Sequence, residues 1–169
     1  MGLGAAATMV VSTPIDAAVR RLPERSLHLY NTHTGESLKT VYWGEGSYQT
    51  KSIAQISRFL RDHRNGAIHP IDPKLLDLMV SVQHKVGAKG AVHIISGYRS
   101  PATNALLASY SDGVASHSLH MEGRAVDIRL PGHPIRHVGR AALSLKAGGV
   151  GVYPGSDFVH IDTGRVRTW

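Results

Sequence analysis

Two short segments in the first third of the chain alternate polar and apolar residues. Residues 26–30 (SLHLY) and 38–43 (LKTVYW) both follow a period of two, as an exposed β-strand does. Residues 31–35 between them (NTHTG) have the composition of a turn. The pattern therefore predicts a β-hairpin.

From residue 50 the apolar period becomes that of an α-helix. Residues 50–64 place apolar side chains on one helical face and charged ones, Asp62 included, outside, and Asn65 and Gly66 are expected to end this helix. Asp72 and Pro73 then supply the N-cap and first residue of a second helix. Its predicted buried stripe consists of Leu75, Leu76, Leu78, Met79, Val82 and Val86.

Short strands and helices alternate over the rest of the chain. Strands are predicted at residues 92–96, 125–130 and 158–162, and helices at 101–110 and 135–146. Residues 148–153 (GGVGVY) are expected to lead into a turn. The whole pattern predicts an α+β fold in which helices pack on a small antiparallel sheet.

The length of 169 residues suits one domain with a hydrophobic core. Residues 1–18 are mostly small and apolar, too short a run to span a membrane, and lack basic residues ahead of them. We expect them to be a truncated export signal of the twin-arginine or Sec type, with an ordinary leader as the alternative. Residues 19–169 then form the single domain, and no integral membrane span is predicted.

The formal net charge of +7 favours a polyanionic partner: nucleic acid, anionic lipid, or a cell wall that carries carboxylates and phosphates. The Lys and Arg residues are scattered, and neither a basic helix nor interleaved basic and aromatic residues are present. A nucleic-acid partner is therefore not expected. The chain contains no cysteine, so any metal must be held by His, Asp or Glu.

Residues 118–128 (SLHMEGRAVDI) contain the strongest chemical signal. His120 precedes Asp127 by seven residues, and Gly123 between them permits a tight turn that brings both side chains together. His160, flanked by apolar residues in the last strand, would be the third ligand. Two imidazoles, one carboxylate and an open fourth position are typical of a catalytic zinc site.

These residues are part of a pattern that resembles a known family. The blocks at residues 96–100 (SGYRS), 118–127 and 148–169 are similar to the zinc peptidases of the D-alanyl-D-alanine carboxypeptidase and murein endopeptidase group, the M15 or LAS type. The closer resemblance is to the murein endopeptidase family once called DUF882. It covers residues 26–169 and implies a Hedgehog-like zinc peptidase fold with His120, Asp127 and His160 as ligands of Zn²⁺.

The resemblance also implies roles for residues around the metal. Arg99 would steer the substrate, since a guanidinium can pair with a carboxylate or brace an oxyanion. Related enzymes place a glutamate three residues before the last ligand, where this chain has Asp157, the predicted general base. His117 and Glu122 are the alternatives for that role. Asp162 is expected to orient a ligand.

The implied function is hydrolysis of peptide bonds in the stem peptides of peptidoglycan, in the periplasm or otherwise outside the cytoplasm. An endopeptidase that acts on cross-links, including those between two diaminopimelate residues, is the first interpretation. A D,D-carboxypeptidase that trims free peptide tails, and a zinc-stabilised wall-binding module that does not cut, are the alternatives.

Overall fold

The computed structural model describes residues 23–110 and 115–169, and the predicted leader lies outside these ranges. All the described strands join one mixed sheet in the order β3-β2-β1-β4-β5-β7-β6-β8. The strands are β1 (Arg25–Asn31), β2 (Ser37–Gly44), β3 (Ser47–Tyr48), β4 (Val92–Ser96), β5 (Ala125–Arg129), β6 (Gly149–Tyr153), β7 (Phe158–Asp162) and β8 (Arg167–Thr168). The helices are α2 (Thr50–Phe59), α3 (Pro73–Val86), α4 (Pro101–Ala108) and α5 (Ile135–Leu145), with 3-10 turns η1 (Leu119–Glu122) and η2 (Pro154–Ser156).

The predicted α+β class is confirmed, and the sheet is larger and more varied than expected. The hairpin of β1 and β2 is antiparallel, as predicted, but β1 pairs with β4 and β6 pairs with β8 in parallel. The β1–β4 pair can be parallel because α2 and α3 lie between these strands in sequence and provide the crossover. The β5–β7 and β6–β7 pairs at the other end are antiparallel.

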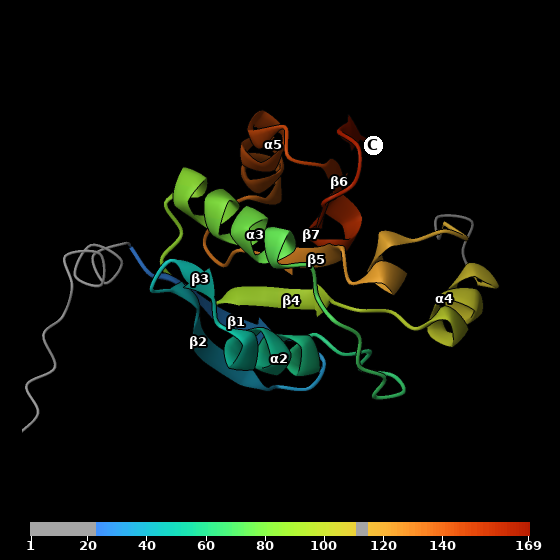
Figure 1. The fold of residues 1–169 in the computed structure, drawn as a ribbon. Helices are drawn as coiled ribbons and strands as arrows, with labels where there is room; N and C mark the ends of the chain where they lie inside the picture. The colour runs from blue at the N-terminus through green and yellow to red at the C-terminus, as the bar shows by residue number, and fades with distance from the viewer. Residues whose placement is uncertain (1–22, 111–114) are drawn as a thin grey trace, which may run out of the picture.

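Helices α3 and α5 pack against each other and against the sheet, whereas α2 packs against β2 (Figure 1). The predicted α3 is confirmed: Asp72 accepts a hydrogen bond from the Lys74 amide, and Gly87 ends the helix in a left-handed conformation. The predicted apolar stripe of this helix is buried in the core. It packs against β1 and α5, and α5 in turn packs against β6 and β7, the strand that carries His160.

Alternation along the central strands separates two faces of the sheet. Val126 and Ile128 of β5, like Val159 and Ile161 of β7, belong to the hydrophobic core. The residues between them, including Asp127 and His160, therefore point to the opposite face. The apolar residues fix which side chains are presented there.

Two parts of the predicted secondary structure need correction. Helix α2 ends at Phe59, six residues before Asn65, and Asp62 is buried with 1% of its surface exposed rather than lying outside. Residues 149–153 lead into a turn, η2, as expected, but they also form strand β6, which the sequence did not predict. Both differences arise from contacts with segments that are distant in sequence, which local periodicity does not report.

The end of α2 receives the turn formed by residues 96–100. The Leu60 carbonyl accepts a hydrogen bond from the Tyr98 amide at 2.7 Å, and the Asp62 carboxylate accepts one from the Ser100 amide at 2.9 Å. Burial opposes ionisation of Asp62, but hydrogen bonds from Thr103 and Ser100 outweigh it and lower the pKa of the carboxyl group. Asp62 therefore fixes the turn that contains Arg99.

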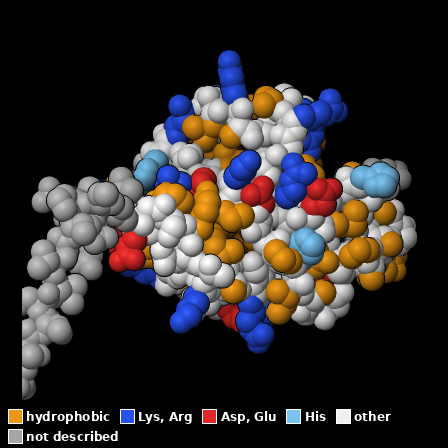
Figure 2. All heavy atoms as spheres, in the orientation of Figure 1, with side chains coloured by type: hydrophobic (Ala, Val, Ile, Leu, Met, Phe, Trp, Pro, Cys, Tyr) orange, Lys and Arg blue, Asp and Glu red, His pale blue; other side chains and the backbone are white. Residues whose placement is uncertain are grey.

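The face of the molecule in Figure 2 has no single basic patch. No helix in the described part of the chain is long and apolar enough to cross a bilayer. Figure 2 shows Lys and Arg side chains spread among acidic and apolar ones on the face in view. This distribution agrees with the scattered basic residues of the sequence.

Replacing Asp62 with alanine is expected to lower the free energy of unfolding by about 1–3 kcal/mol, because the buried Ser100 N–H loses its acceptor. Urea unfolding at pH 7 measures this loss, and Glu24→Ala, which removes an exposed carboxylate, is the matched control. The folded pKa of Asp62 is lowered, so its contribution is present at neutral pH and is lost as the pH falls below about 4. An equal loss in Glu24→Ala would contradict this assignment.

Candidate metal centre

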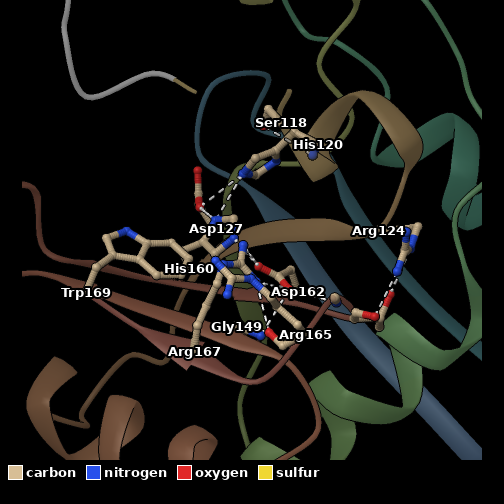
Figure 3. Close-up of polar contacts among 12 residues, drawn as sticks. Ser118, His120, Arg124, Asp127, Gly149, His160, Asp162, Arg165, Arg167 and Trp169 are labelled. Atoms are coloured by element: carbon tan, nitrogen blue, oxygen red, sulfur yellow. Dashed lines mark hydrogen bonds and ion pairs between the residues drawn. The ribbon is translucent and has the colours of Figure 1, made fainter. Parts of the chain in front are cut away.

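Three side chains from different elements meet on the face of the sheet opposite the core. His120 comes from η1, Asp127 from β5 and His160 from β7, and all three are buried. Asp127 and His160 stand directly opposite each other in the antiparallel β5–β7 ladder. His120 reaches them because Gly123 ends η1 with φ 65°, a conformation that favours glycine. Figure 3 shows the three side chains pointing toward one another.

The spacing of the donor atoms fits one small cation. His160 Nδ1 lies 2.9 Å from Asp127 Oδ1 and 3.2 Å from His120 Nε2, and His120 Nε2 lies 3.3 Å from Asp127 Oδ1. Ligands of tetrahedral zinc, bonded at about 2.0–2.1 Å, are separated by about 3.3 Å. The three atoms therefore form a face close to that of a zinc tetrahedron, with room for a fourth ligand.

The backbone around residues 96–100 fixes the orientation of His120. The His120 Nδ1–H donates to the Gly97 carbonyl at 2.8 Å, and the Arg99 amide donates to the His120 carbonyl at 3.2 Å. A neutral imidazole carries one N–H, so this contact leaves Nε2 with a lone pair toward the shared point. The turn thus selects the tautomer that a metal requires.

Asp162 holds His160 from the other side. Asp162 is completely buried, and its Oδ2 accepts a hydrogen bond from His160 Nε2 at 3.1 Å. His160 Nδ1 is then the ring nitrogen left for the shared point. The expected orienting role of Asp162 fits this geometry.

Charge in the cluster is balanced between the carboxylate and the imidazoles. Burial opposes ionisation of Asp127, but the electrostatic influence of His120 and the hydrogen bond from His160 outweigh it, so the pKa of Asp127 lies well below the ordinary value. Burial also opposes protonation of His160, but hydrogen bonds to Asp127 and Asp162 outweigh it and raise its pKa. A proton on His160 Nδ1 thus occupies the position where a metal would bind, and a metal must displace it.

A cavity of about 480 Å³ opens beside the three donors and is lined by His117 and Arg99 as well. The Arg99 side chain is 13% exposed, and its Nη2 lies 4.0 Å from Asp127 Oδ2. Its Nη1 donates to Asn104 Oδ1 at 3.3 Å, and its buried Nε has no hydrogen-bond partner among the described residues. The cavity therefore presents a cation next to the candidate metal position.

Two residues predicted as possible bases do not line this cavity. The Asp157 side chain is 62% exposed and forms an ion pair with Arg129 at 2.7 Å. Glu122 forms an ion pair with Arg124 at 2.9 Å. Asp157 is not among the residues that line the cavity, so its role as general base stays a prediction from the sequence.

Sequence reasoning missed one wall of the cavity, formed by Tyr153, Arg167 and Trp169. Arg167 donates to Asp162 through both terminal nitrogens, at 2.7 and 3.0 Å. The Trp169 ring centroid lies 5.2 Å from that of His160. The pair of glycines in β6 could have indicated this wall. Because these two positions have no side chains, there is room for Arg167 and Trp169 beside the strand.

Comparisons with known proteins identify the family of the chain. The family model described as "Peptidoglycan L,D-endopeptidase MepK", of the Peptidase_M15_2 family, matches residues 20–169. A protein of Escherichia coli (strain K12) with the same name is 43% identical over 169 residues, which cover 100% of this chain and 91% of that protein. A protein of Haemophilus influenzae named "Probable peptidoglycan L,D-endopeptidase MepK" is 37% identical over 161 residues, 95% of this chain and 87% of that protein. The family resemblance inferred from the sequence is confirmed.

His160→Ala is expected to abolish retention of one zinc ion per chain, because it removes one of three buried donors. Equilibrium dialysis followed by metal analysis measures the stoichiometry, and His137→Ala, an exposed histidine of α5, is the control. For the wild type, zinc affinity should rise as the pH rises above about 6.5, since the metal displaces a proton from a His160 whose pKa is raised. Unchanged stoichiometry in His160→Ala would reject the site.

Proposed function

Because the chain belongs to the peptidoglycan L,D-endopeptidase MepK family of the M15 peptidases, we propose that it hydrolyses L,D cross-links between peptidoglycan stem peptides with one zinc ion. The observation that carries the proposal is the convergence of His120, Asp127 and His160 beside a cavity. Three protein ligands with an accessible fourth position are typical of catalytic zinc and not of structural zinc.

Zinc fits the donor set better than calcium or magnesium does. Two imidazole nitrogens and one carboxylate oxygen form the cluster. Calcium and magnesium prefer sites built of oxygen atoms, whereas imidazole suits zinc and several transition metals. His120, Asp127 and His160 would hold zinc, which would there supply a water molecule of lowered pKa and polarisation of a carbonyl group.

Arg99 is the proposed substrate-steering residue. In an L,D cross-link, the carbon that bears the scissile nitrogen on the amine side also bears a carboxylate. The guanidinium of Arg99 lines the cavity, and no carboxylate of residues 23–110 and 115–169 approaches it closer than 4.0 Å. It can therefore pair with the substrate carboxylate or with the oxyanion that forms at the scissile carbonyl.

His117 is the proposed acceptor of the proton from the attacking water. Among the described residues that line the cavity, His120, Asp127 and His160 are assigned to the metal, and His117 is the remaining imidazole or carboxylate. The same side chain can return the proton to the leaving amine. Asp157 would have to leave Arg129 before it could take this role.

The proposed substrate class also implies that the protein is exported. Peptidoglycan lies outside the cytoplasmic membrane, so the proposed activity requires export. We propose that residues 1–18 serve this step and that residues 19–169 act as one catalytic domain, in line with the family match over residues 20–169.

Purified protein loaded with zinc should split a muropeptide dimer joined by an L,D cross-link into two monomers. Chelation of the metal should abolish the reaction, and zinc should restore it. Mass spectrometry of the products distinguishes the alternatives: loss of a terminal alanine identifies a D,D-carboxypeptidase, and binding without new peptide ends identifies a non-catalytic module. A matched dimer with a D,D cross-link tests which bond is preferred.

Two substitutions test the proton acceptor. His117→Asn should keep zinc and lower kcat by about 10²–10⁴-fold, whereas Asp157→Asn should keep both zinc and most of the activity. Steady-state kinetics on the L,D-linked dimer, together with zinc analysis of each variant, measure this. The reverse result, an inactive Asp157→Asn and an active His117→Asn, would return the role to Asp157.

A further inference from the structure

The segment that follows β7 returns to the metal centre through β8. Strand β8 pairs with β6 in parallel, and the backbone of Trp169 continues the contact, because its amide donates to the Val150 carbonyl and its carbonyl accepts from the Val152 amide. Arg167 and Trp169 are two residues apart and both line the cavity. The segment thus adds two large side chains to the face that carries His160.

Two glycines of β6 make room for these side chains. A β-carbon on Gly151 would lie 2.7 Å from Trp169 Cε2, and one on Gly149 would lie 2.5 Å from Asp162 Oδ2 and closer still to Arg167 Nη1. Neither glycine has a positive φ, so the backbone itself would accept a side chain. Their role is close approach: they let Arg167 and Trp169 pack against the strand.

Arg167 satisfies the carboxylate behind His160. Asp162 is fully buried, and an unpaired charge in such a position is strongly unfavourable. Arg167 contacts both carboxylate oxygens, and the amides of Gly149 and Gly164 donate to Oδ1 at 3.0 and 2.8 Å. These donors fix the carboxylate so that Oδ2 faces His160 Nε2, as Figure 3 shows.

Trp169 limits the movement of the same imidazole. Its ring lies against His160, its indole N–H donates to the Tyr153 hydroxyl at 2.6 Å, and the Arg167 guanidinium lies 4.8 Å from its ring centroid. The indole is therefore held by contacts with both Tyr153 and Arg167. A rotation of His160 away from the shared point would have to displace it.

From these contacts we infer that Arg167 and Trp169 are positioning residues for the metal: through Asp162 and by direct packing, they hold His160 with Nδ1 toward the ion. The inference rests on the proposed function only in taking His160 as a ligand. The residues act on the affinity and geometry of the metal site and take no part in the bond-breaking step.

The test measures metal affinity by competition with a chromophoric chelator. Arg167→Gln should weaken zinc binding by about 10–100-fold, the usual effect of losing a residue that orients a ligand. Arg167→Lys keeps the charge but loses the two-point contact, so its affinity should fall between those of the wild type and Arg167→Gln. Arg165→Gln is the matched control: it removes the same charge from an exposed residue, and only the backbone carbonyl of Arg165 contacts Arg167.

A second measurement separates positioning from general stability. Cobalt(II) in place of zinc should give an altered visible spectrum in Arg167→Lys and Trp169→Leu, because the angle of the His160 ring changes at the metal. These milder variants also serve if Arg167→Gln does not fold. Wild-type affinity and an unchanged cobalt spectrum in both would overturn the inference, as would an equal loss in Arg165→Gln. Failure of the wild type itself to bind metal would instead reject the proposed function.

Discussion

The buried carboxylate of Asp127 is the constraint on which the rest of the structure depends. A carboxylate inside a protein requires a positive partner, and two imidazoles from separate elements lie within hydrogen-bond distance of it. Each imidazole is oriented in turn by an acceptor on its far side, a backbone carbonyl for His120 and a carboxylate for His160. The cluster is therefore a place where a cation is favoured, built on strands whose opposite face is the hydrophobic core.

Those features of the fold that depend on local sequence could be predicted. The β1–β2 hairpin shows the alternation of polar and apolar residues typical of strands, and α3 has a helical period, an N-cap and a terminating glycine. The positions of both therefore follow from sequence alone. The proximity of the three candidate donors could be predicted as well, because a turn glycine and two short apolar strands restrict where His120, Asp127 and His160 can lie. The direct opposition of Asp127 and His160 in the β5–β7 ladder agrees with that expectation.

Features that depend on distant segments could not be predicted. The sequence pattern predicts Asp62 on the surface of a helix, but Asp62 lies beyond the end of α2 and binds a turn that follows β4. Strand β6 was not predicted because its sequence is rich in glycine. Glycine is needed there because residues after β7 occupy the space that side chains of β6 would fill. Asp157 shows a related limit: the family resemblance makes it a candidate base, but its ion pair with Arg129 depends on a distant residue that the sequence did not point to.

The register of β5 against β7 has a consequence for how this protein can change over time. Because successive side chains alternate between faces, the insertion or deletion of one residue in either strand would turn the catalytic face into the hydrophobic one. Substitutions can accumulate in the loops and on the outer helices while the length of these two strands stays constant. Evolutionary drift in this region should therefore proceed by exchange of residues and not by gain or loss of single codons.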